Sequence, residues 1–191
     1  TKGLPRNAGA MRRVMAGAPT FLMVGTLEPR KGHVLVLDAF DRLWAQGTQV
    51  NLVIVGKKGW MADAIVARLR RHPELGKRLF WIPAASDEYL ATLYAAASCL
   101  LAASEGEGFG LPLIEAAIHK LPILAADIPV FREVAGGHAA YFDADSIALA
   151  TAVVEWLALF EQGRHPRSDA MPFLDWQQSA DQFKSKLIID C

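Results

Sequence analysis

The sequence predicts a doubly wound α/β domain built on a parallel sheet. Short apolar runs alternate along the chain with longer stretches whose apolar residues recur at helical spacing. The short runs are apolar throughout, which is typical of strands covered on both faces. The length of 191 residues, 52% of them hydrophobic and 21% charged, suits one domain with a sizeable core. Such sheets bind ligands beyond the carboxyl ends of their strands, so the functional loops should lie there.

Each expected strand is a compact apolar run followed by a turn or a helical pattern. The first run ends at Gly25, and the second, rich in valine and isoleucine, ends at Gly56. Later runs are shorter, and the third closes at Pro83. The expected strands are residues 20–25, 50–56, 79–82, 98–102, 123–125 and 139–142.

The expected helices follow from apolar spacing and from start signals. Ser86 can cap one helix, Pro112 stands in the first turn of another, and Asp145 and Ser146 stand where an N-cap is expected. The expected helices are residues 34–45, 62–71, 87–97, 111–119 and 146–160.

The domain organisation is read as one unit over residues 1–191. Residues 1–19 are expected to be a linker that enters the domain, and the start without Met suggests a piece of a longer protein. Residues 164–191 are expected to form a crossover, with Pro166 and Pro172 in a connector before a last helix at 175–187.

Composition excludes several classes of function. Twenty basic and twenty acidic residues give a formal net charge of zero, which argues against nucleic-acid binding. No apolar run reaches the roughly 20 residues of a membrane span, and no signal peptide opens the chain. Cys99, in an apolar run, and Cys191, the last residue, favour a reducing compartment over a disulfide.

The loop after the first strand predicts an anion site. It begins at Gly25 and places Arg30 and Lys31 just before a helix. The unpaired amides and the positive dipole end of that helix add to the two cations. The alternative interpretation is that both cations are solvated turn residues.

A second loop, residues 103–116, combines glycines with two carboxylates. Three glycines within five positions allow close backbone approach to a ligand, and the helix start leaves amides at residues 109–111 free to donate. Glu107 and Glu115 could accept hydrogen bonds from sugar hydroxyls. Glu115 could instead be a solvated helix residue, although its apolar neighbours suggest that the carboxylate needs a partner.

Metal-binding signals are weak. Asp143 and Asp145 could bind a divalent cation, but their place before a helix favours helix capping. The five histidines are scattered, without a pair at metal-binding spacing. We expect no metal site.

The two loops together resemble the retaining glycosyltransferases of family four, the group 1 glycosyltransferases. The stretch from Gly25 to Gly32 is similar to that family's phosphate-binding loop. The stretch from Glu107 to Glu115 is similar to its E-x7-E signature, with Gly-Phe-Gly-Leu-Pro in the centre. Residues 126–134 resemble its donor-side loop, so the likeness runs over residues 20–142, with a continuation towards Trp176.

The resemblance implies a GT-B fold of two Rossmann-like domains that face each other across a cleft. This chain would be the C-terminal, donor-binding half, without the N-terminal acceptor domain. Lys31 and Arg30 would hold the diphosphate and act in catalysis together with Glu107, which would bind the transferred sugar. Glu115 would bind the ribose. The other donor-binding positions implied are Gly25, Thr26, Trp81, Ile82, Gly108, Phe109, Gly110 and Leu111.

Within this set, Trp81 and Ile82 would meet the base, partly through main-chain groups, and the amides of residues 109–111 would meet the phosphates or the sugar. Thr26 stands where many relatives carry Arg, and Arg30 is a candidate to replace it.

The implied activity is transfer of a hexose, with retention, from a GDP- or UDP-linked sugar to a glycan or lipid-linked acceptor. The loop around Lys31 leans towards mannose from GDP-mannose in bacterial surface polysaccharide synthesis. No metal or other cofactor is implied. The enzyme would be cytoplasmic, or peripheral on the inner membrane face through the missing half, and this half alone would not transfer sugar. The alternatives are a non-catalytic nucleotide-sugar-binding module and a sugar-nucleotide epimerase of the same architecture.

Overall fold

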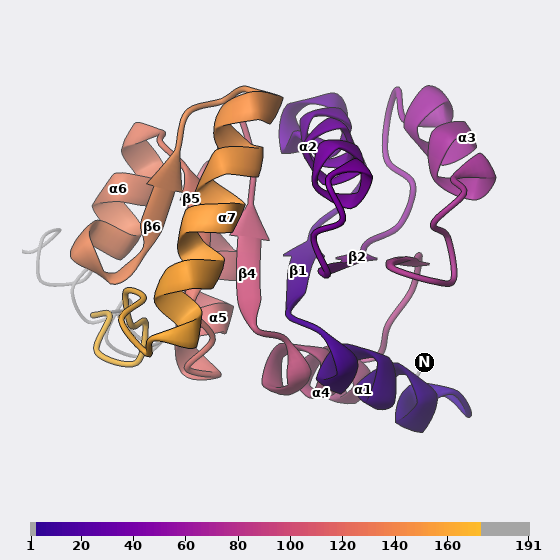
Figure 1. Cartoon of the computed structure of the whole chain (residues 1–191), viewed down its shortest axis with the longest axis horizontal. Helices are drawn as coiled ribbons and strands as arrows, with labels where there is room; N and C mark the ends of the chain where they lie inside the picture. The colour runs from indigo at the N-terminus through magenta and orange to yellow at the C-terminus, as the bar shows by residue number, and fades with distance from the viewer. Residues whose placement is uncertain (1–2, 173–191) are drawn as a thin grey trace, which may run out of the picture.

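A six-stranded parallel sheet forms the centre of the protein, as the sequence predicts. The computed structural model describes residues 3–172, and the sheet order is β3-β2-β1-β4-β5-β6 (Figure 1). Every neighbouring pair of strands is parallel. The strands are β1 (Thr20–Val24), β2 (Asn51–Val55), β3 (Leu79–Ile82), β4 (Cys99–Ala102), β5 (Ile123–Ala126) and β6 (Ala140–Phe142).

Helices connect successive strands and cover the sheet. The helices are α1 (Ala8–Gly17), α2 (His33–Ala45), α3 (Asp63–Arg71), α4 (Asp87–Ala96), α5 (Leu111–Ile118), α6 (Pro129–Ala135) and α7 (Ser146–Glu161), with short 3-10 turns η1 (Pro29–Lys31) and η2 (Gly136–His138). Helix α2 packs along α7, and α1 packs against α4 at the end where the strands begin (Figure 1). The doubly wound α/β fold class is therefore confirmed.

The core forms because the central strands are apolar on both faces. All five residues of β2 are buried, and in the register Leu22 of β1 lies between Val53 of β2 and Leu100 of β4. The ring of Phe21 packs against Phe40 of α2 at 5.7 Å and against Trp156 of α7 at 5.3 Å. A sheet buried in this way fixes its strand ends, which carry the loops of interest.

Residues 1–19 differ from the expected linker, because residues 8–17 form helix α1. Met11 and Met15 of this helix are buried, and Asn51 of β2 donates a hydrogen bond to the main-chain oxygen of Val14 at 3.1 Å. The linker prediction was wrong because Pro5, Gly9 and Gly17 favour a loop, although the residues between them form a short amphipathic pattern. That pattern gains its partner only when α4 folds beside it.

Residues 126–134 and 164–172 lie on either side of β6 and α7 in the chain. Within residues 126–134, expected as a donor-side loop, the helix α6 begins at Pro129. The segment 164–172 is the expected connector: Ser168 is buried and donates to the carbonyl of Leu121 at 2.7 Å. The last helix expected at 175–187 lies outside the described residues.

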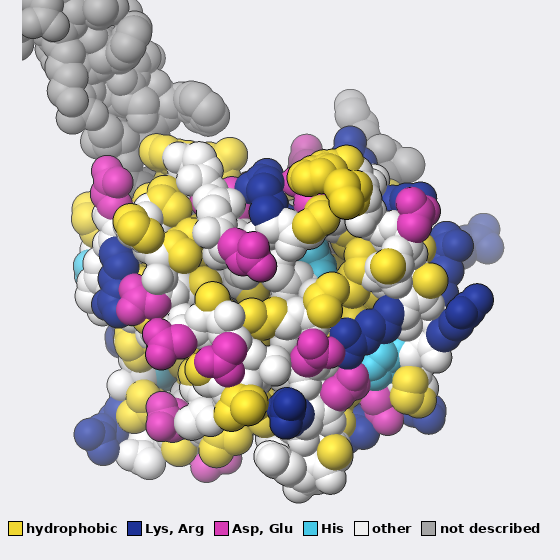
Figure 2. All heavy atoms as spheres, turned by 90° about the horizontal axis from the view of Figure 1, so that it is seen from above, with side chains coloured by type: hydrophobic (Ala, Val, Ile, Leu, Met, Phe, Trp, Pro, Cys, Tyr) yellow, Lys and Arg dark blue, Asp and Glu magenta, His cyan; other side chains and the backbone are white. Residues whose placement is uncertain are grey.

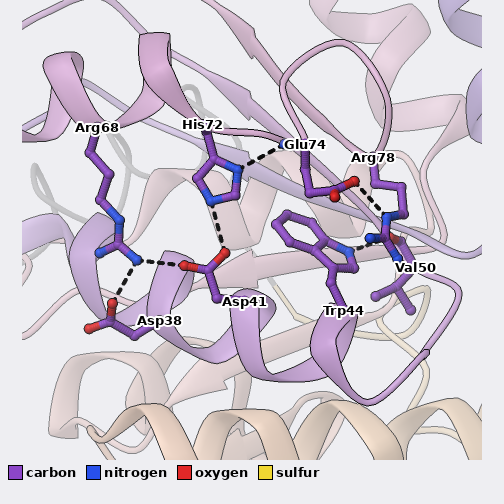
Figure 3. A network of polar contacts seen from close by, with 8 residues as sticks. All are labelled: Asp38, Asp41, Trp44, Val50, Arg68, His72, Glu74 and Arg78. Atoms are coloured by element: carbon purple, nitrogen blue, oxygen red, sulfur yellow. Dashed lines mark hydrogen bonds and ion pairs between the residues drawn. The ribbon is translucent and has the colours of Figure 1, made fainter.

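Polar contacts hold α2 to α3 away from the predicted site (Figure 3). Arg68 of α3 donates to Asp38 at 2.7 Å and to Asp41 at 2.9 Å, both on α2. His72, the residue after α3, contacts Asp41 at 2.8 Å. Burial opposes the charge of Arg68, but its two carboxylate partners raise the pKa of the guanidinium overall. This cluster fastens two helices on one face.

Helix caps follow the sequence expectations. Ser86 accepts a hydrogen bond from the amide of Tyr89 at 3.1 Å, and Asp145 accepts from the amides of Ile147 and Ala148 at 2.8 and 2.9 Å. Asp145 therefore caps α7, as its position predicts. None of the helices within residues 3–172 combines the length and apolarity needed to span a bilayer.

Candidate donor-binding site

Two loops meet at the carboxyl ends of the neighbouring strands β1 and β4. The amide of Glu105 donates to the carbonyl of Arg30 at 2.9 Å, so the loops are joined through their main chains. Gly32, with φ of +73°, makes this contact possible, because a Cβ there would lie 2.1 Å from the carbonyl oxygen of Ala103. The glycine thus brings the start of α2 against the loop that follows β4.

A carboxylate and two cations form the centre of the site. Lys31 Nζ binds Glu107 Oε1, and Arg30 Nη1 lies 3.4 Å from Glu107 Oε2. Ser104 donates to Glu107 at 2.7 Å. Arg30 also donates to the carbonyl of Gly106 at 3.1 Å and lies 3.2 Å from Glu28. The three residues predicted to be catalytic, Lys31, Arg30 and Glu107, are therefore in contact.

Burial makes this cluster electrostatically strong. The side chains of Lys31 and Glu107 are only 13% and 11% exposed, whereas that of Arg30 is 46% exposed. Burial alone would raise the pKa of Glu107, but hydrogen bonds from Lys31 and Ser104 and the charges of both cations hold the pKa below its ordinary value. Glu107 is thus an anion that neutralises Lys31 in the free protein.

A small pocket lies beneath the cluster. Its polar wall contains Gly25, Lys31, His33, Ser104 and Glu107. Its volume of about 10 Å³ is close to that of one water-sized probe. The side chain of Lys31 crosses in front of Gly25, since a Cβ there would lie 3.7 Å from the Lys31 Cε. The pocket therefore suits a single oxygen atom of a ligand more than a ring.

The start of α5 supplies main-chain donors beside this pocket. Gly110 adopts φ of +76° and is the N-cap of α5. Within the described part of the chain, the amides of Phe109 and Gly110 donate no hydrogen bond. The side chains of Phe109 and Leu111 are 58% and 52% exposed. Gly108 and Phe109 are exposed, whereas Gly110 is buried, so the free amide of Gly110 lies inside the loop and the apolar side chains lie at the surface.

Glu115 makes its hydrogen bond to a residue outside the Lys31–Glu107 cluster. Its carboxylate accepts a hydrogen bond at 2.6 Å from Tyr94, a buried residue of α4. Burial, strengthened by the negative charge of Glu115, raises the pKa of Tyr94, so the phenol stays protonated and donates. The partner that the apolar surroundings of Glu115 suggested is thus a tyrosine from another helix.

The residues predicted to meet the base lie at the edge strand β3. Trp81 donates from its indole to the carbonyl of Gly56 at 3.0 Å, and the Ile82 carbonyl accepts from the amide of Gly56 at 3.0 Å. Trp81 and Ile82 line a separate pocket of about 490 Å³ against α1. Thr26 follows Gly25 and lies beside Gly59.

Three residues of the site were missed by sequence reasoning. Ser104 and His33 lie in or next to the quoted loops, and their polar side chains beside a predicted site were the available signal. Tyr94 gave no signal, because its contact with Glu115 depends on how α4 packs beside α5. Among residues 3–172, no three histidine, cysteine or acidic side chains are grouped so as to hold a metal ion.

Comparison with known proteins decides the family. The family model described as "Glycosyl transferases group 1" matches residues 13–166. The chain belongs to the group 1 glycosyltransferases. The match includes β1, the cluster around Lys31 and Glu107, and the whole of α5.

The curated relatives of this group 1 glycosyltransferase chain are much longer than the chain itself. It is 56% identical over 180 residues to the serotype-specific mannosyltransferase WbdA of Escherichia coli. The aligned residues make up 94% of this chain and 22% of WbdA. It is also 34% identical over 118 residues to O-antigen chain mannosyltransferase B of Escherichia coli, covering 60% of the chain and 30% of the relative. The chain thus spans about a fifth to a third of the length of these relatives.

Solved structures show the same fold. The sucrose-phosphate synthase of Thermosynechococcus elongatus matches with a TM-score of 0.73 and 25% identity, over 98% of this chain and 50% of that one. HepE of Anabaena, solved in complex with UDP and glucose, matches with a TM-score of 0.70 and 20% identity, over 88% of this chain and 46% of that one. In both cases the chain corresponds to about half of the solved protein.

Proposed function

We propose that this chain is the donor-binding domain of a retaining hexosyltransferase that takes mannose from GDP-mannose. The observation that carries the proposal is the contact of Lys31, Arg30 and Glu107 at the carboxyl ends of β1 and β4. The likeness to the mannosyltransferase WbdA and to O-antigen chain mannosyltransferase B supports the choice of sugar. The acceptor would be a glycan or a lipid-linked glycan, bound mostly by a second, N-terminal domain.

The two cations are suited to a diphosphate. Lys31 is buried enough for its charge to be weakly screened, and Arg30 is exposed enough to follow a ligand. The free amides at Phe109 and Gly110 add donors at a helix N-terminus, which favours an anion. In the free protein Glu107 occupies the cations, so a bound diphosphate would replace this carboxylate as their partner.

Glu107 would then turn to the transferred sugar. A carboxylate accepts hydrogen bonds from sugar hydroxyls, and Ser104 remains beside it to fix its orientation. This exchange couples the two halves of the donor: the diphosphate binds the cations and the sugar binds the released acid. It explains why one carboxylate lies so near both cations.

Cleavage of the anomeric bond leaves negative charge on the departing diphosphate. Fixed cations and helix-end amides stabilise such charge in place, a contribution of several kcal/mol in other enzymes (about 3 to 4 for one donor). We propose that Lys31, Arg30 and the amides of α5 perform this role, without a metal ion or other cofactor. Glu115 would bind the ribose, with Trp81 and Ile82 near the base.

Calorimetric titration of the 191-residue chain tests the proposal. The ligands are GDP, GDP-mannose, UDP, UDP-glucose and ADP, each also with the Lys31→Ala variant. We expect binding of the guanine nucleotides, with the loss of Lys31 weakening every diphosphate. Tighter binding of a uridine nucleotide would show that the donor carries uracil and not guanine. Absence of binding for every ligand would contradict the donor-site proposal.

The alternative of a binding module without catalysis is less well supported. A module that only held the nucleotide would not need a buried acid at the cation site, because burying Glu107 carries a desolvation cost. The mannosyltransferase relatives also favour an enzyme.

A further inference from the structure

His33 is a buried polar side chain that the function proposed above leaves without a role. It is the first residue of α2 and only 2% exposed. Neither ring nitrogen has a partner that meets hydrogen-bond distance and angle within residues 3–172, although the Glu28 main chain lies near enough to raise the pKa of the ring. Buried polar groups are satisfied in the great majority of cases, so an unpaired imidazole calls for a partner.

The imidazole is uncharged at neutral pH. Burial lowers the pKa of His33 to about 4, and the nearby charge of Lys31 lowers it further, while the Glu28 main chain and carboxylate act in the opposite direction. A neutral imidazole offers one N–H donor and one acceptor nitrogen. His33 is therefore a hydrogen-bonding group and adds no third cation to Arg30 and Lys31.

The surroundings of His33 indicate what its partner would be. The ring lines the small pocket that also contains Lys31, Ser104 and Glu107. The only other unpaired buried side-chain nitrogen within the described residues belongs to Trp156, which lies among the rings of Phe21 and Phe160. Of these two residues, only His33 is placed beside a charged cluster to which a ligand could bring an oxygen.

The polar groups of the pocket fit a hydroxyl better than a phosphate oxygen. A phosphate oxygen only accepts hydrogen bonds, so it would leave Glu107, released from the cations by the diphosphate, without a donor. A hydroxyl can donate to Glu107 and accept from His33 at the same time. The volume of about 10 Å³ also suits one oxygen atom.

We propose that His33 is a specificity-determining residue, whose neutral ring binds one hydroxyl of the hexose that the donor carries. This inference rests on the proposed function, since it takes the ligand to be a nucleotide sugar with its diphosphate at Lys31 and Arg30. Gly32 places the ring, because its left-handed backbone turns the start of α2 towards the loop after β4. His33 would thus contribute to selection of the sugar and make no contact with the nucleotide part of the donor.

The test compares GDP with GDP-mannose in calorimetric titrations of the full 191-residue chain. His33→Leu removes the hydrogen bond at similar volume, and His33→Gln retains a donor and an acceptor. Trp156→Phe is the matched control, because it removes the other unpaired buried nitrogen away from the pocket. Thermal unfolding of each variant establishes that it is folded, and His33→Met is used if the leucine variant is not.

We expect His33→Leu to weaken GDP-mannose binding about 3- to 10-fold, the loss of one hydrogen bond, with GDP binding unchanged. His33→Gln should fall between wild type and His33→Leu, and Trp156→Phe should change neither affinity. Equal loss for both ligands, no loss, or equal affinity of the wild type for GDP and GDP-mannose would overturn the assignment of His33 alone. A wild-type chain that binds neither ligand would overturn the donor site as well.

Discussion

The pairing of Lys31 with Glu107 shows how a single residue can be held ready for a ligand. Both side chains are largely buried, and each neutralises the other across the junction of two loops. A buried cation whose partner were removed would be costly, so the pair can separate only when another anion arrives. In the free protein, the proposed anion site is therefore occupied by the protein's own carboxylate.

Replacement of Lys31 tests the anion site directly. We expect Lys31→Ala to weaken GDP binding about 10- to 100-fold, because a charge-assisted contact contributes roughly 1.5 to 3 kcal/mol. Binding of guanosine, which has no phosphate, should be unchanged. Lys77→Ala, at an exposed lysine before β3, is the control. Equal losses for GDP and guanosine in a calorimetric titration would contradict the phosphate assignment.

Replacement of Glu115 tests the ribose assignment. Glu115→Ala should weaken GDP binding and spare 2′-deoxy-GDP, because only the ribose offers the hydroxyl that the carboxylate would accept from. Tyr94→Phe should reduce the preference for GDP over 2′-deoxy-GDP, because the Glu115 carboxylate loses the hydrogen bond that orients it. Tyr89→Phe, at another buried tyrosine of α4, should leave this preference unchanged. If both nucleotides lose affinity alike, Glu115 has a structural role.

The lowered pKa of Glu107 predicts a pH dependence of stability. A carboxylate whose folded pKa lies below its unfolded value of about 4.3 contributes its full stabilisation above that value and loses it as the pH falls through the folded pKa. The advantage of the wild type over Glu107→Gln in unfolding free energy should therefore be constant near neutral pH. It should decrease below about pH 4, where Glu107 becomes protonated. Urea unfolding at pH 3, 4, 5 and 7 measures it. A constant difference would show that the pKa is not lowered.

At the scale of secondary structure, the junction of η1 and α2 determines where the cations lie. Lys31 ends η1, and the next residue, Gly32, is both the C-cap of that turn and the N-cap of α2. The left-handed backbone of Gly32 and its approach to Ala103 exclude any side chain. The site thus depends on one glycine between two helical segments.

Gly32→Ala is predicted to disrupt both stability and binding. The new Cβ would meet the Ala103 oxygen at 2.1 Å, in addition to the left-handed strain of about 1 kcal/mol. Gly47→Ala is the matched control, since Gly47 also has a positive φ, +83°, but open space around its Cβ position. We expect the melting temperature of Gly32→Ala to fall well below that of Gly47→Ala, with weaker GDP binding. Similar melting temperatures of the two variants would mean that the loops after β1 and β4 can move apart without loss of stability.

At the scale of the whole molecule, the carboxyl end of the sheet presents apolar side chains to solvent. Exposed residues there follow β1, β2 and β4 along the chain: Val34, Trp60, Met61, Phe109 and Leu111. Figure 2 looks onto this end and shows hydrophobic side chains among charged ones of both signs. A second domain that faces the cleft would cover part of this surface, in agreement with the expected half of a GT-B enzyme.

The 191-residue chain is predicted to bind GDP-mannose without transferring mannose. Positioning of two reactants can supply about 7 to 11 kcal/mol of a barrier, and residues 3–172 form one sheet domain without a second domain that could place an acceptor hydroxyl at the donor. The measurement is a transfer assay with one donor and one acceptor, on this chain and on a longer protein that contains it with an N-terminal domain. Robust turnover by the 191-residue chain would contradict the two-domain proposal.

The local sequence was sufficient for the strands, for most helices and for the placement of the two candidate loops after β1 and β4. A run such as residues 50–56 is apolar at every core position, so burial on both faces follows wherever it lies in the sheet. The same holds for caps such as Ser86 and Asp145, whose partners are two or three residues away. These features depend on near neighbours, which the sequence displays directly.

Tertiary structure alone decided which of those residues meet. Lys31 and Glu107 are 76 residues apart and touch because the sheet order places β1 beside β4, while Glu115 turns to Tyr94 on a different helix. The helix α1 and the buried ring of His33 were likewise invisible, since each depends on surfaces supplied by distant segments. Spacing along the chain carries no information on such contacts, because the packing of strands and helices, and not their local propensity, sets the distances.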